Sequence, residues 1–309
     1  MKAILHNVGL NPEVEAFAKE HFELVTPESM TEVQAGEIEV LLTNGKGKAP
    51  KELLDRLPNL KMIDVLGVGY DGVDTAECKR RGIEICVTAG VLTADVADLA
   101  LGLTLSLLRQ IPSGQELVCS KRWEHKEKLP LGRQVSFKRV GIAGLGQIGQ
   151  AAARRCAAFE MDISYFDLKQ KDVPYHYFDN LTELAANVDI LIICAAATKE
   201  NRGMVNAEVL KALGPSGVVV NVARGSLIDE QALVEAVKNG TIAGCALDVF
   251  EKEPFAPHEL MGRPNVVLTP HIASATVETR KKMAAIVLEN LKAFMEGRPR
   301  PTALPFERL

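Results

Sequence analysis

The sequence predicts an α/β protein of two domains, each built around a parallel sheet. Its length of 309 residues favours two domains over one. Short apolar runs typical of buried strands alternate with helical patterns along the whole chain, and this alternation indicates parallel strands joined by crossover helices. A polar, mixed-charge segment at 115–138 separates an earlier series of these elements from a later one.

The earlier series begins at the N-terminus and ends in a long apolar helix. Strand patterns are expected at 2–5, 39–43, 60–65 and 83–87, and helical patterns at 13–20, 50–57 and 74–80. The helix expected at 95–109 carries Val96, Leu99, Leu103 and Leu107 at steps of three and four residues, which is the period of one helix face.

The later series predicts six strands with helices between them. The strands are expected at 140–143, 162–166, 189–194, 218–222, 243–247 and 266–268. The helices are expected at 148–159, 181–186, 206–213, 229–239 and, as a short connection, 257–261. A final helix at 276–296 stops at Gly297. We therefore predict two Rossmann-like or flavodoxin-like domains with doubly wound parallel sheets, one spanning 1–98 plus 282–309 and the other 99–281.

The composition is that of a globular protein without a nucleic-acid or membrane partner. Hydrophobic residues make up 47% of the chain, and the net charge of -4 provides no basic surface for a phosphate backbone. No apolar run reaches about 18 residues, and the N-terminus lacks the pattern of a secretory signal. The six cysteines are scattered without a Cys-x-x-Cys pair, so we expect reduced core thiols, no metal site and a cytoplasmic location.

A glycine-rich turn joins the strand expected at 140–143 to the following helix. It consists of Gly144, Leu145, Gly146, Gln147, Ile148 and Gly149. The spacing G-x-G-x-x-G carries weight because a strand precedes it and a helix follows it. We expect Gly144 to allow the tight turn, Gly146 the close approach of a pyrophosphate, and Gly149 close packing of helix on strand. The turn therefore predicts a dinucleotide site.

An acidic residue ends the next expected strand. Asp167 lies 18 residues after Gly149, where a carboxylate can accept hydrogen bonds from both adenosine ribose hydroxyls and repel a 2′-phosphate. NAD is therefore the expected cofactor. Lys169 and Lys171 follow closely and could partly offset the repulsion, so NADP stays an alternative.

Three polar side chains follow expected strands of the later series. Arg224 follows 218–222, Glu253 follows 243–247 and His271 follows 266–268. In a parallel sheet all three lie at the carboxyl edge, where the nicotinamide must also bind. Singly, each has a structural explanation, such as a turn or a hydrogen-bonding histidine. Together they supply what reduction of a 2-oxo acid requires: a cation for the carboxylate, a proton donor and a carboxylate that tunes the donor.

These segments resemble the D-isomer-specific 2-hydroxyacid dehydrogenase family. The resemblance covers nearly the whole chain and is carried by the glycine turn and by the stretches 221–229, 247–254 and 270–274. Within the family, the chain is most similar to glyoxylate/hydroxypyruvate reductases and hydroxyphenylpyruvate reductases, through 91–98, 212–215 and 276–280.

The resemblance implies a role for each matching residue of the catalytic site. Arg224 would hold the substrate carboxylate and polarise the carbonyl, and His271 would donate a proton to the carbonyl oxygen as hydride arrives. Glu253 would hydrogen-bond the imidazole, orient it and stabilise its charged form. Backbone N–H groups near Val68 and Gly69 would bind the substrate carboxylate.

The resemblance also implies further cofactor contacts and a homodimer. Asp248 would contact the carboxamide of nicotinamide, and Val222 and Ala223 would line that pocket through their backbone. Thr93 is a weaker cofactor candidate. Trp123 has two equally supported interpretations: it reaches the neighbouring subunit's substrate cleft, or it is a structural aromatic residue of the dimer arm.

The expected activity is reversible NAD(P)H-dependent reduction of a small 2-oxo acid to the (R)-2-hydroxy acid. Glyoxylate and hydroxypyruvate are the leading substrates, with aryl pyruvates behind them. NADPH-using reductases of this subgroup commonly carry a small polar residue and an arginine where this chain has Asp167 and Leu168, which disfavours NADP here. The alternatives are an NAD-sensing binding protein on the same fold, or an enzyme that oxidises formate, phosphite or 3-phosphoglycerate. A phosphoglycerate enzyme is expected to carry a long C-terminal regulatory domain, whereas this chain ends at Leu309.

Overall fold

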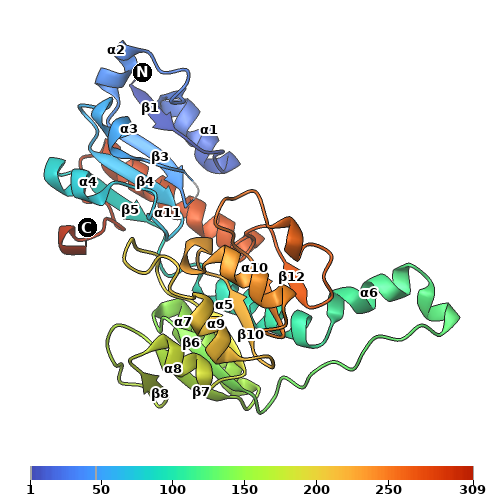
Figure 1. The fold of residues 1–309 in the computed structure, drawn as a ribbon. Helices are drawn as coiled ribbons and strands as arrows, with labels where there is room; N and C mark the ends of the chain where they lie inside the picture. The colour runs from blue at the N-terminus through green and yellow to red at the C-terminus, as the bar shows by residue number, and fades with distance from the viewer. Residues whose placement is uncertain (1, 46, 309) are drawn as a thin grey trace. The chain divides into compact units, whose positions relative to one another are not determined.

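Two compact units make up the chain in the computed structural model, which describes residues 2–45 and 47–308 (Figure 1). Unit 1 comprises Met1–Leu92 and Ala275–Leu309, and unit 2 comprises Thr93–Ser274. The boundaries expected at 98 and 281 fall a few residues later, inside the helices α5 (Thr93–Leu108) and α11 (Val277–Met295). Each unit is built around a parallel sheet with helices, which confirms the predicted fold class.

Unit 1 contains, within the described residues, a five-stranded parallel sheet. The strands are β1 (Ala3–His6), β2 (Glu23–Val25), β3 (Val40–Asn44), β4 (Met62–Leu66) and β5 (Glu84–Val87), in the order β2-β1-β3-β4-β5. The helices are α1 (Pro12–His21), α2 (Glu32–Glu37), α3 (Lys51–Asp55), α4 (Thr75–Arg81), α11 and the short η4 (Phe306–Arg308). The sequence patterns do not predict β2 or α2, because neither element has an apolar pattern long enough to identify it.

Alternate residues of the unit 1 strands fill two cores, one on each face of the sheet. Ile4 and Leu42 pack with Val287 of α11, whereas Leu5 and Leu41 pack into the core on the opposite face. This alternation follows from the two-residue period of a strand, which directs successive side chains to opposite faces.

Unit 2 contains, in the part of the chain that the structure describes, a seven-stranded parallel sheet. The strands are β6 (Arg139–Ala143), β7 (Asp162–Phe166), β8 (His176–Phe178), β9 (Ile190–Ile193), β10 (Val218–Asn221), β11 (Gly244–Leu247) and β12 (Val266–Leu268), in the order β12-β11-β10-β9-β6-β7-β8. The helices besides α5 are α6 (Ile111–Cys119), η1 (Arg122–His125), α7 (Gln147–Ala158), α8 (Leu181–Ala186), α9 (Ala207–Leu213), η2 (Gly225–Leu227), α10 (Glu230–Lys238) and η3 (His258–Leu260). The expectation of six strands is wrong by one: it omits the edge strand β8, which is defined by its pairing with β7.

The strand order of unit 2 reverses at β6, whose neighbours in the sheet are β7 and β9. In doubly wound sheets, ligands bind outside the carboxyl ends of the strands at such a switch point. The strands β9, β10 and β11 are buried along their whole length, as expected of central parallel strands that are covered on both faces. The glycine turn leaves β6 at this switch point.

A long arm, residues 109–138, connects α5 to β6 within unit 2 (Figure 1). It contains α6 and η1, which the sequence patterns do not predict, and then runs to β6 without regular structure. Several of its large apolar side chains are exposed, among them Val118, Trp123, Leu131 and Phe137. Exposed apolar side chains gathered on one segment are typical of an interaction surface.

The described residues include no helix long and apolar enough to cross a membrane. They also include no group of three or more His, Cys, Asp or Glu side chains that could hold a metal ion. All six cysteines lie in the described ranges and are free thiols. Four of them are buried, as expected, but Cys119 on α6 is exposed and is not a core thiol.

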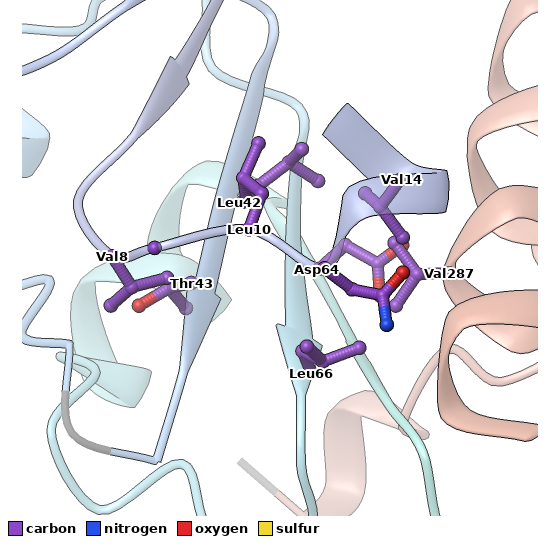
Figure 2. A pocket seen from close by; sticks show the side chains of 10 residues that line it. Val8, Leu10, Val14, Leu42, Thr43, Asp64, Leu66 and Val287 are labelled. Carbon is purple, nitrogen blue, oxygen red and sulfur yellow. The ribbon is translucent and has the colours of Figure 1, made fainter. Parts of the chain in front are cut away.

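Asp64 on β4 is a buried carboxyl group in the core of unit 1 (Figure 2). Its Oδ1 accepts a hydrogen bond of 3.2 Å from Nδ2 of Asn290 on α11, whereas its Oδ2 has no hydrogen-bond partner among the described residues. A cavity of about 10 Å³, lined also by Leu10, Val14 and Val287, lies beside it and has room for about one water. Burial raises the pKa of Asp64 to about 8, opposed only in part by the Asn290 hydrogen bond. Asp64 is therefore a neutral acid in the folded protein near neutral pH.

We expect Asp64→Asn to stabilise the protein increasingly as the pH rises from about 5 to about 8. In the unfolded chain Asp64 loses its proton near the ordinary value of 3.8, whereas the folded protein retains it up to about pH 8. The free energy of unfolding of the native chain therefore falls across this window, by about 1.4 kcal/mol per pH unit for one such group. Asparagine removes this proton-linked loss. The difference in thermal unfolding midpoint between variant and native chain, measured at both ends of the window, checks the prediction.

Asp189→Asn is the matched control for Asp64→Asn. The Arg139 guanidinium holds the pKa of Asp189 below its usual range, so Asp189 is ionised throughout this window. Its replacement should lower the midpoint by a similar amount at both pH values. An effect of Asp64→Asn that does not grow with pH would contradict the neutral buried acid.

Candidate active site

Two glycines of the turn, Gly144 and Gly149, have backbone atoms of the protein so close to them that no side chain would fit. Gly144 has a φ of 94°, and a Cβ there would lie 2.5 Å from backbone atoms of Ala195. A Cβ on Gly149 would lie 2.1 Å from the carbonyl oxygen of Gly144. Gly144 therefore permits the turn, and Gly149 permits the close approach of α7 to β6, as the sequence predicts.

Gly146 differs, because no contact among the described residues requires a glycine at this position. Its φ of -74° suits any residue, and no described heavy atom lies within 4 Å of the place that a Cβ would take. Gly146 is exposed and caps α7, whose first N–H groups carry the positive end of the helix dipole. This open space over a helix N-terminus fits a pyrophosphate. Leu145 is buried, Ile148 is half-buried and Gln147 is exposed.

Asp167 follows β7 and contacts the glycine turn directly. Its Oδ2 accepts the backbone N–H of Leu145 at 2.9 Å and lies 3.5 Å from Nζ of Lys171. The hydroxyl of Tyr177 donates to the Asp167 carbonyl oxygen at 3.2 Å. The carboxylate thus lies beside the turn, which is the placement that a ribose-binding acid requires. The ribose contact itself stays a prediction.

Arg224, Glu253 and His271 follow three consecutive strands of the unit 2 sheet. Arg224 follows β10, Glu253 follows β11 and His271 follows β12, and the ends of these parallel strands are in register. The three residues therefore lie at the carboxyl edge that also carries the glycine turn, with β9 between β10 and β6. The expectation that they share one sheet edge is correct.

His271 and Glu253 form a hydrogen-bonded pair. Nδ1 of His271 lies 2.9 Å from Oε1 and 2.8 Å from Oε2 of Glu253, and the two side chains are only 22% and 18% exposed. An ionised carboxylate can only accept hydrogen bonds, so the pairing places a proton on Nδ1 and leaves Nε2 for a substrate. The backbone N–H of Phe250 donates to Oε1 at 3.4 Å and helps to orient Glu253.

Asp248 holds the segment that carries His271. Its carboxylate is fully buried and accepts hydrogen bonds from Oγ1 of Thr269 at 2.7 Å, the N–H of Ile272 at 2.8 Å and the N–H of Ala273 at 2.9 Å. These donors lie on both sides of His271 in the chain. Both carboxylate oxygens of Asp248 are therefore used within the protein, and its expected contact with the nicotinamide carboxamide stays a prediction.

Asn221, which the sequence analysis does not single out, positions Arg224. Nδ2 of Asn221 donates to the Arg224 carbonyl oxygen at 2.9 Å, and its Oδ1 accepts the N–H of Ala223 at 3.0 Å. Nη1 of Arg224 donates to the Ala223 carbonyl oxygen at 2.8 Å. A polar residue at the end of an all-valine strand is the signal that could have identified Asn221.

Gly225 is also not predicted from the sequence as a site residue. It lets the turn at Arg224 pack against the segment that leads to Glu253. A Cβ on Gly225 would lie 2.0 Å from the carbonyl carbon of Phe250. Only a glycine allows these two loops to touch through their backbones, so the Arg-Gly pair is more than a turn. The close packing places the loops after β10 and β11 side by side.

The remaining predicted residues lie in both units. Val222 is buried and Ala223 is half-buried in the turn before Arg224. Thr93 begins α5. Val68 and Gly69 belong to unit 1, in the loop after β4 at the carboxyl edge of that sheet. Their ligand contacts stay predictions.

Known proteins that are similar in sequence to this chain are dehydrogenases and reductases. Residues 101–273 match the family model described as D-isomer specific 2-hydroxyacid dehydrogenase, NAD binding domain. The chain is 44% identical over 268 residues to hydroxyphenylpyruvate reductase of Plectranthus scutellarioides, covering 86% of this chain and 85% of that protein. It is 43% identical over 270 residues to glyoxylate/hydroxypyruvate reductase A of Arabidopsis thaliana, covering 87% and 86%.

A solved structure is similar over almost the whole chain. It is the NADPH-dependent glyoxylate/hydroxypyruvate reductase from Sinorhizobium meliloti in complex with NADP and malonate. The TM-score is 0.92 at 40% identity, and the match covers 98% of this chain and 97% of that one.

A dinucleotide turn and a paired histidine on one sheet edge define a nicotinamide-dependent oxidoreductase. More specifically, the chain belongs to the D-isomer specific 2-hydroxyacid dehydrogenase family, as its sequence motifs indicate. It is an enzyme that uses NAD(P), and the matched NAD-binding region lies inside unit 2.

We expect Gly146→Ala to weaken dinucleotide binding without destabilising the fold. The added methyl group would enter the open space over the start of α7, where a pyrophosphate would bind, but it would meet no described atom of the protein. The Kd for NADH should rise roughly tenfold, equivalent to about 1.4 kcal/mol. Titration of NADH fluorescence measures this change, and the thermal unfolding midpoint should stay within a degree or two of the native value.

Gly149→Ala provides the contrasting control. Its methyl group would overlap the Gly144 carbonyl oxygen, and such overpacking costs about 1–3 kcal/mol, so the midpoint should fall clearly. An unchanged NADH affinity in Gly146→Ala would show that the space over α7 is not the pyrophosphate site.

Proposed function

We propose that this chain catalyses the reversible NAD(P)H-dependent reduction of a small 2-oxo acid to the (R)-2-hydroxy acid. The proposal depends on the hydrogen-bonded pair of His271 and Glu253. Arg224 lies on the same sheet edge, after the second strand from the one that His271 follows, and this edge also carries the glycine turn. Glyoxylate and hydroxypyruvate are the leading substrates and aryl pyruvates the next, in line with the names of the Arabidopsis and Plectranthus relatives. Malonate in the Sinorhizobium relative supports a site for a short carboxylate.

The residues of the site suit the two ends of such a substrate. The Arg224 guanidinium would bind the carboxylate through two parallel hydrogen bonds and polarise the adjacent carbonyl. Backbone N–H groups near Val68 and Gly69 would provide a second contact for the carboxylate. When bound, NAD(P)H supplies the hydride to C2. His271 donates the Nε2 proton to the carbonyl oxygen, while Glu253 keeps the imidazole oriented and stabilises the imidazolium. In the reverse direction Nε2 takes the hydroxyl proton.

NAD is the preferred cofactor in this proposal. In the described part of the chain, the Leu145 N–H and the Lys171 ammonium group both contact Oδ2 of Asp167, so Oδ1 can accept hydrogen bonds from the ribose hydroxyls. A 2′-phosphate would instead meet a like charge. The proposed preference therefore differs from that of the Sinorhizobium relative, which is NADPH-dependent.

We expect His271→Ala to lower turnover of 2-oxo acids by about 100-fold or more, because general acid catalysis contributes about 10²–10⁴-fold. NADH binding should change little. NADH oxidation followed by absorbance over a panel of glyoxylate, hydroxypyruvate and aryl pyruvates measures the first quantity, and NADH fluorescence measures the second. The same panel ranks the substrates.

His258→Ala is the matched control, because His258 is an exposed histidine of the same unit outside the three strand ends. It should retain the native turnover. Native turnover in His271→Ala would remove His271 as the acid. Tight NADH binding with no turnover across the whole panel would contradict the proposed reaction and favour an NAD-sensing protein.

We further propose that the protein is cytoplasmic and that it forms a homodimer through the arm between α5 and β6. The support is the exposure of the arm's apolar side chains, of which Leu131 is 96% exposed and Trp123 is 65% exposed. A second copy would cover this surface. Both interpretations of Trp123, as a residue at the neighbouring subunit's cleft and as a structural aromatic residue of the arm, require such a dimer.

We expect Leu131→Glu to weaken self-association, raising the dimer Kd by about tenfold or more because a charge would be buried in an apolar interface. Sedimentation velocity over a concentration series measures this. Val33→Glu is the control, since Val33 is 74% exposed in unit 1, outside the arm. Equal effects of the two variants, or a native chain that is monomeric throughout, would rule out the arm as the interface.

A further inference from the structure

We propose that Lys171 is a specificity-determining residue that lets the ribose site accept NADP as well as NAD. Its ammonium group lies beside Asp167 and would pair with the carboxylate when NAD is bound, or with the 2′-phosphate when NADP is bound. The inference depends on the proposed role of Asp167 as the ribose-binding acid.

The ion pair between Lys171 and Asp167 is the first observation. Nζ of Lys171 lies 3.5 Å from Oδ2 of Asp167, and the side chains are 37% and 18% exposed. The acid that would repel a 2′-phosphate therefore already has a cation at its side. A partly exposed lysine at this distance is held only weakly, so the ammonium group can leave the carboxylate for a stronger partner.

The backbone of Lys171 is nevertheless fixed, which is the second observation. The hydroxyl of Tyr165, a fully buried residue of β7, accepts the Lys171 N–H at 2.7 Å and lies 3.3 Å from the Lys171 carbonyl oxygen, to which it donates. The Tyr165 ring packs against Tyr177 of β8, with 5.3 Å between ring centroids, and the Tyr177 hydroxyl binds the Asp167 carbonyl. Both ends of the turn from Asp167 to Lys171 are thus tied to tyrosines of the sheet.

A lysine held in this way changes the electrostatics of the site. Because Lys171 lies beside both groups, its positive charge offsets part of the repulsion between the Asp167 carboxylate and a phosphate dianion. The free ammonium hydrogens can then form charge-assisted hydrogen bonds with phosphate oxygens. For NAD, the lysine can stay on Oδ2 while Oδ1 accepts the ribose hydroxyls.

Lys169 of the same turn provides a comparison. It is exposed, and the described residues show neither an ion pair nor a side-chain hydrogen bond for it. Because its side chain is exposed to solvent, salt screens its charge. Lys171 is therefore held beside Asp167 by specific contacts, whereas Lys169 is not.

The test is direct titration of NADH and NADPH fluorescence with native protein, Lys171→Ala, Lys169→Ala and Lys171→Arg. We expect Lys171→Ala to raise the Kd of NADPH about tenfold and that of NADH less than about threefold, because the lost contact is a charge-assisted one to the phosphate. Lys169→Ala should change both by less than about threefold. Lys171→Arg should retain NADPH binding, since a guanidinium also binds phosphate. Thermal unfolding midpoints should be unchanged, because the backbone ties remain.

Three outcomes decide the matter. An equal loss of NADPH affinity in Lys169→Ala and Lys171→Ala would overturn the proposal, since general charge would explain it. An unchanged Kd for NADPH in Lys171→Ala would also overturn it. Titration of Asp167→Asn with NADH tests the proposed ribose site separately from the role of Lys171. An unchanged Kd for NADH in this variant would refute the role of Asp167 itself.

Discussion

The segment that carries His271 depends on hydrogen bonds to one buried carboxylate, that of Asp248. His271 has a φ of 56°, in the left-handed region that costs a non-glycine residue about 1–3 kcal/mol. Asp248 accepts three hydrogen bonds from residues on both sides of His271, and hydrogen bonds to a charged group contribute about 1.5–3 kcal/mol each. These hydrogen bonds oppose the backbone strain. The imidazole is thereby held where Glu253 binds Nδ1, and the opposite nitrogen is left for chemistry.

Two buried aspartates of this chain differ in the number of hydrogen bonds that their carboxyl groups accept. Asp64 in unit 1 receives one hydrogen bond from Asn290, and its burial raises its pKa to about 8. Asp248 in unit 2 is equally buried but accepts three hydrogen bonds, so both of its carboxylate oxygens have partners within the protein. The first aspartate therefore links the stability of unit 1 to pH. The second anchors the site.

The sequence predicts the central strands, and it places Arg224, Glu253 and His271 at one sheet edge, for one physical reason. Apolar runs such as β9 and β10 mark buried parallel strands, and a polar residue directly after such a run, such as Arg224, must lie at the carboxyl edge. The edge strands β2 and β8 are three residues long and exist through pairing with a neighbour, which no local pattern reveals. Gly225 is likewise explained only by its contact with Phe250 of another loop.

Two residues that support the site, Asn221 and Tyr165, are not identified from the sequence because they look like core residues. Asn221, Asp248 and Tyr165 are all buried, each at or next to the end of a strand, and each binds the backbone of a following loop. A loop at a sheet edge must find partners for its N–H and C=O groups, and these buried side chains supply them. The proposed site residues Arg224, His271 and Lys171 can therefore stay partly open to ligands, while these buried side chains fix their backbones or those of adjacent residues. The sheet, through buried polar groups, thus sets the geometry of both the proposed catalytic end and the proposed ribose end of the site.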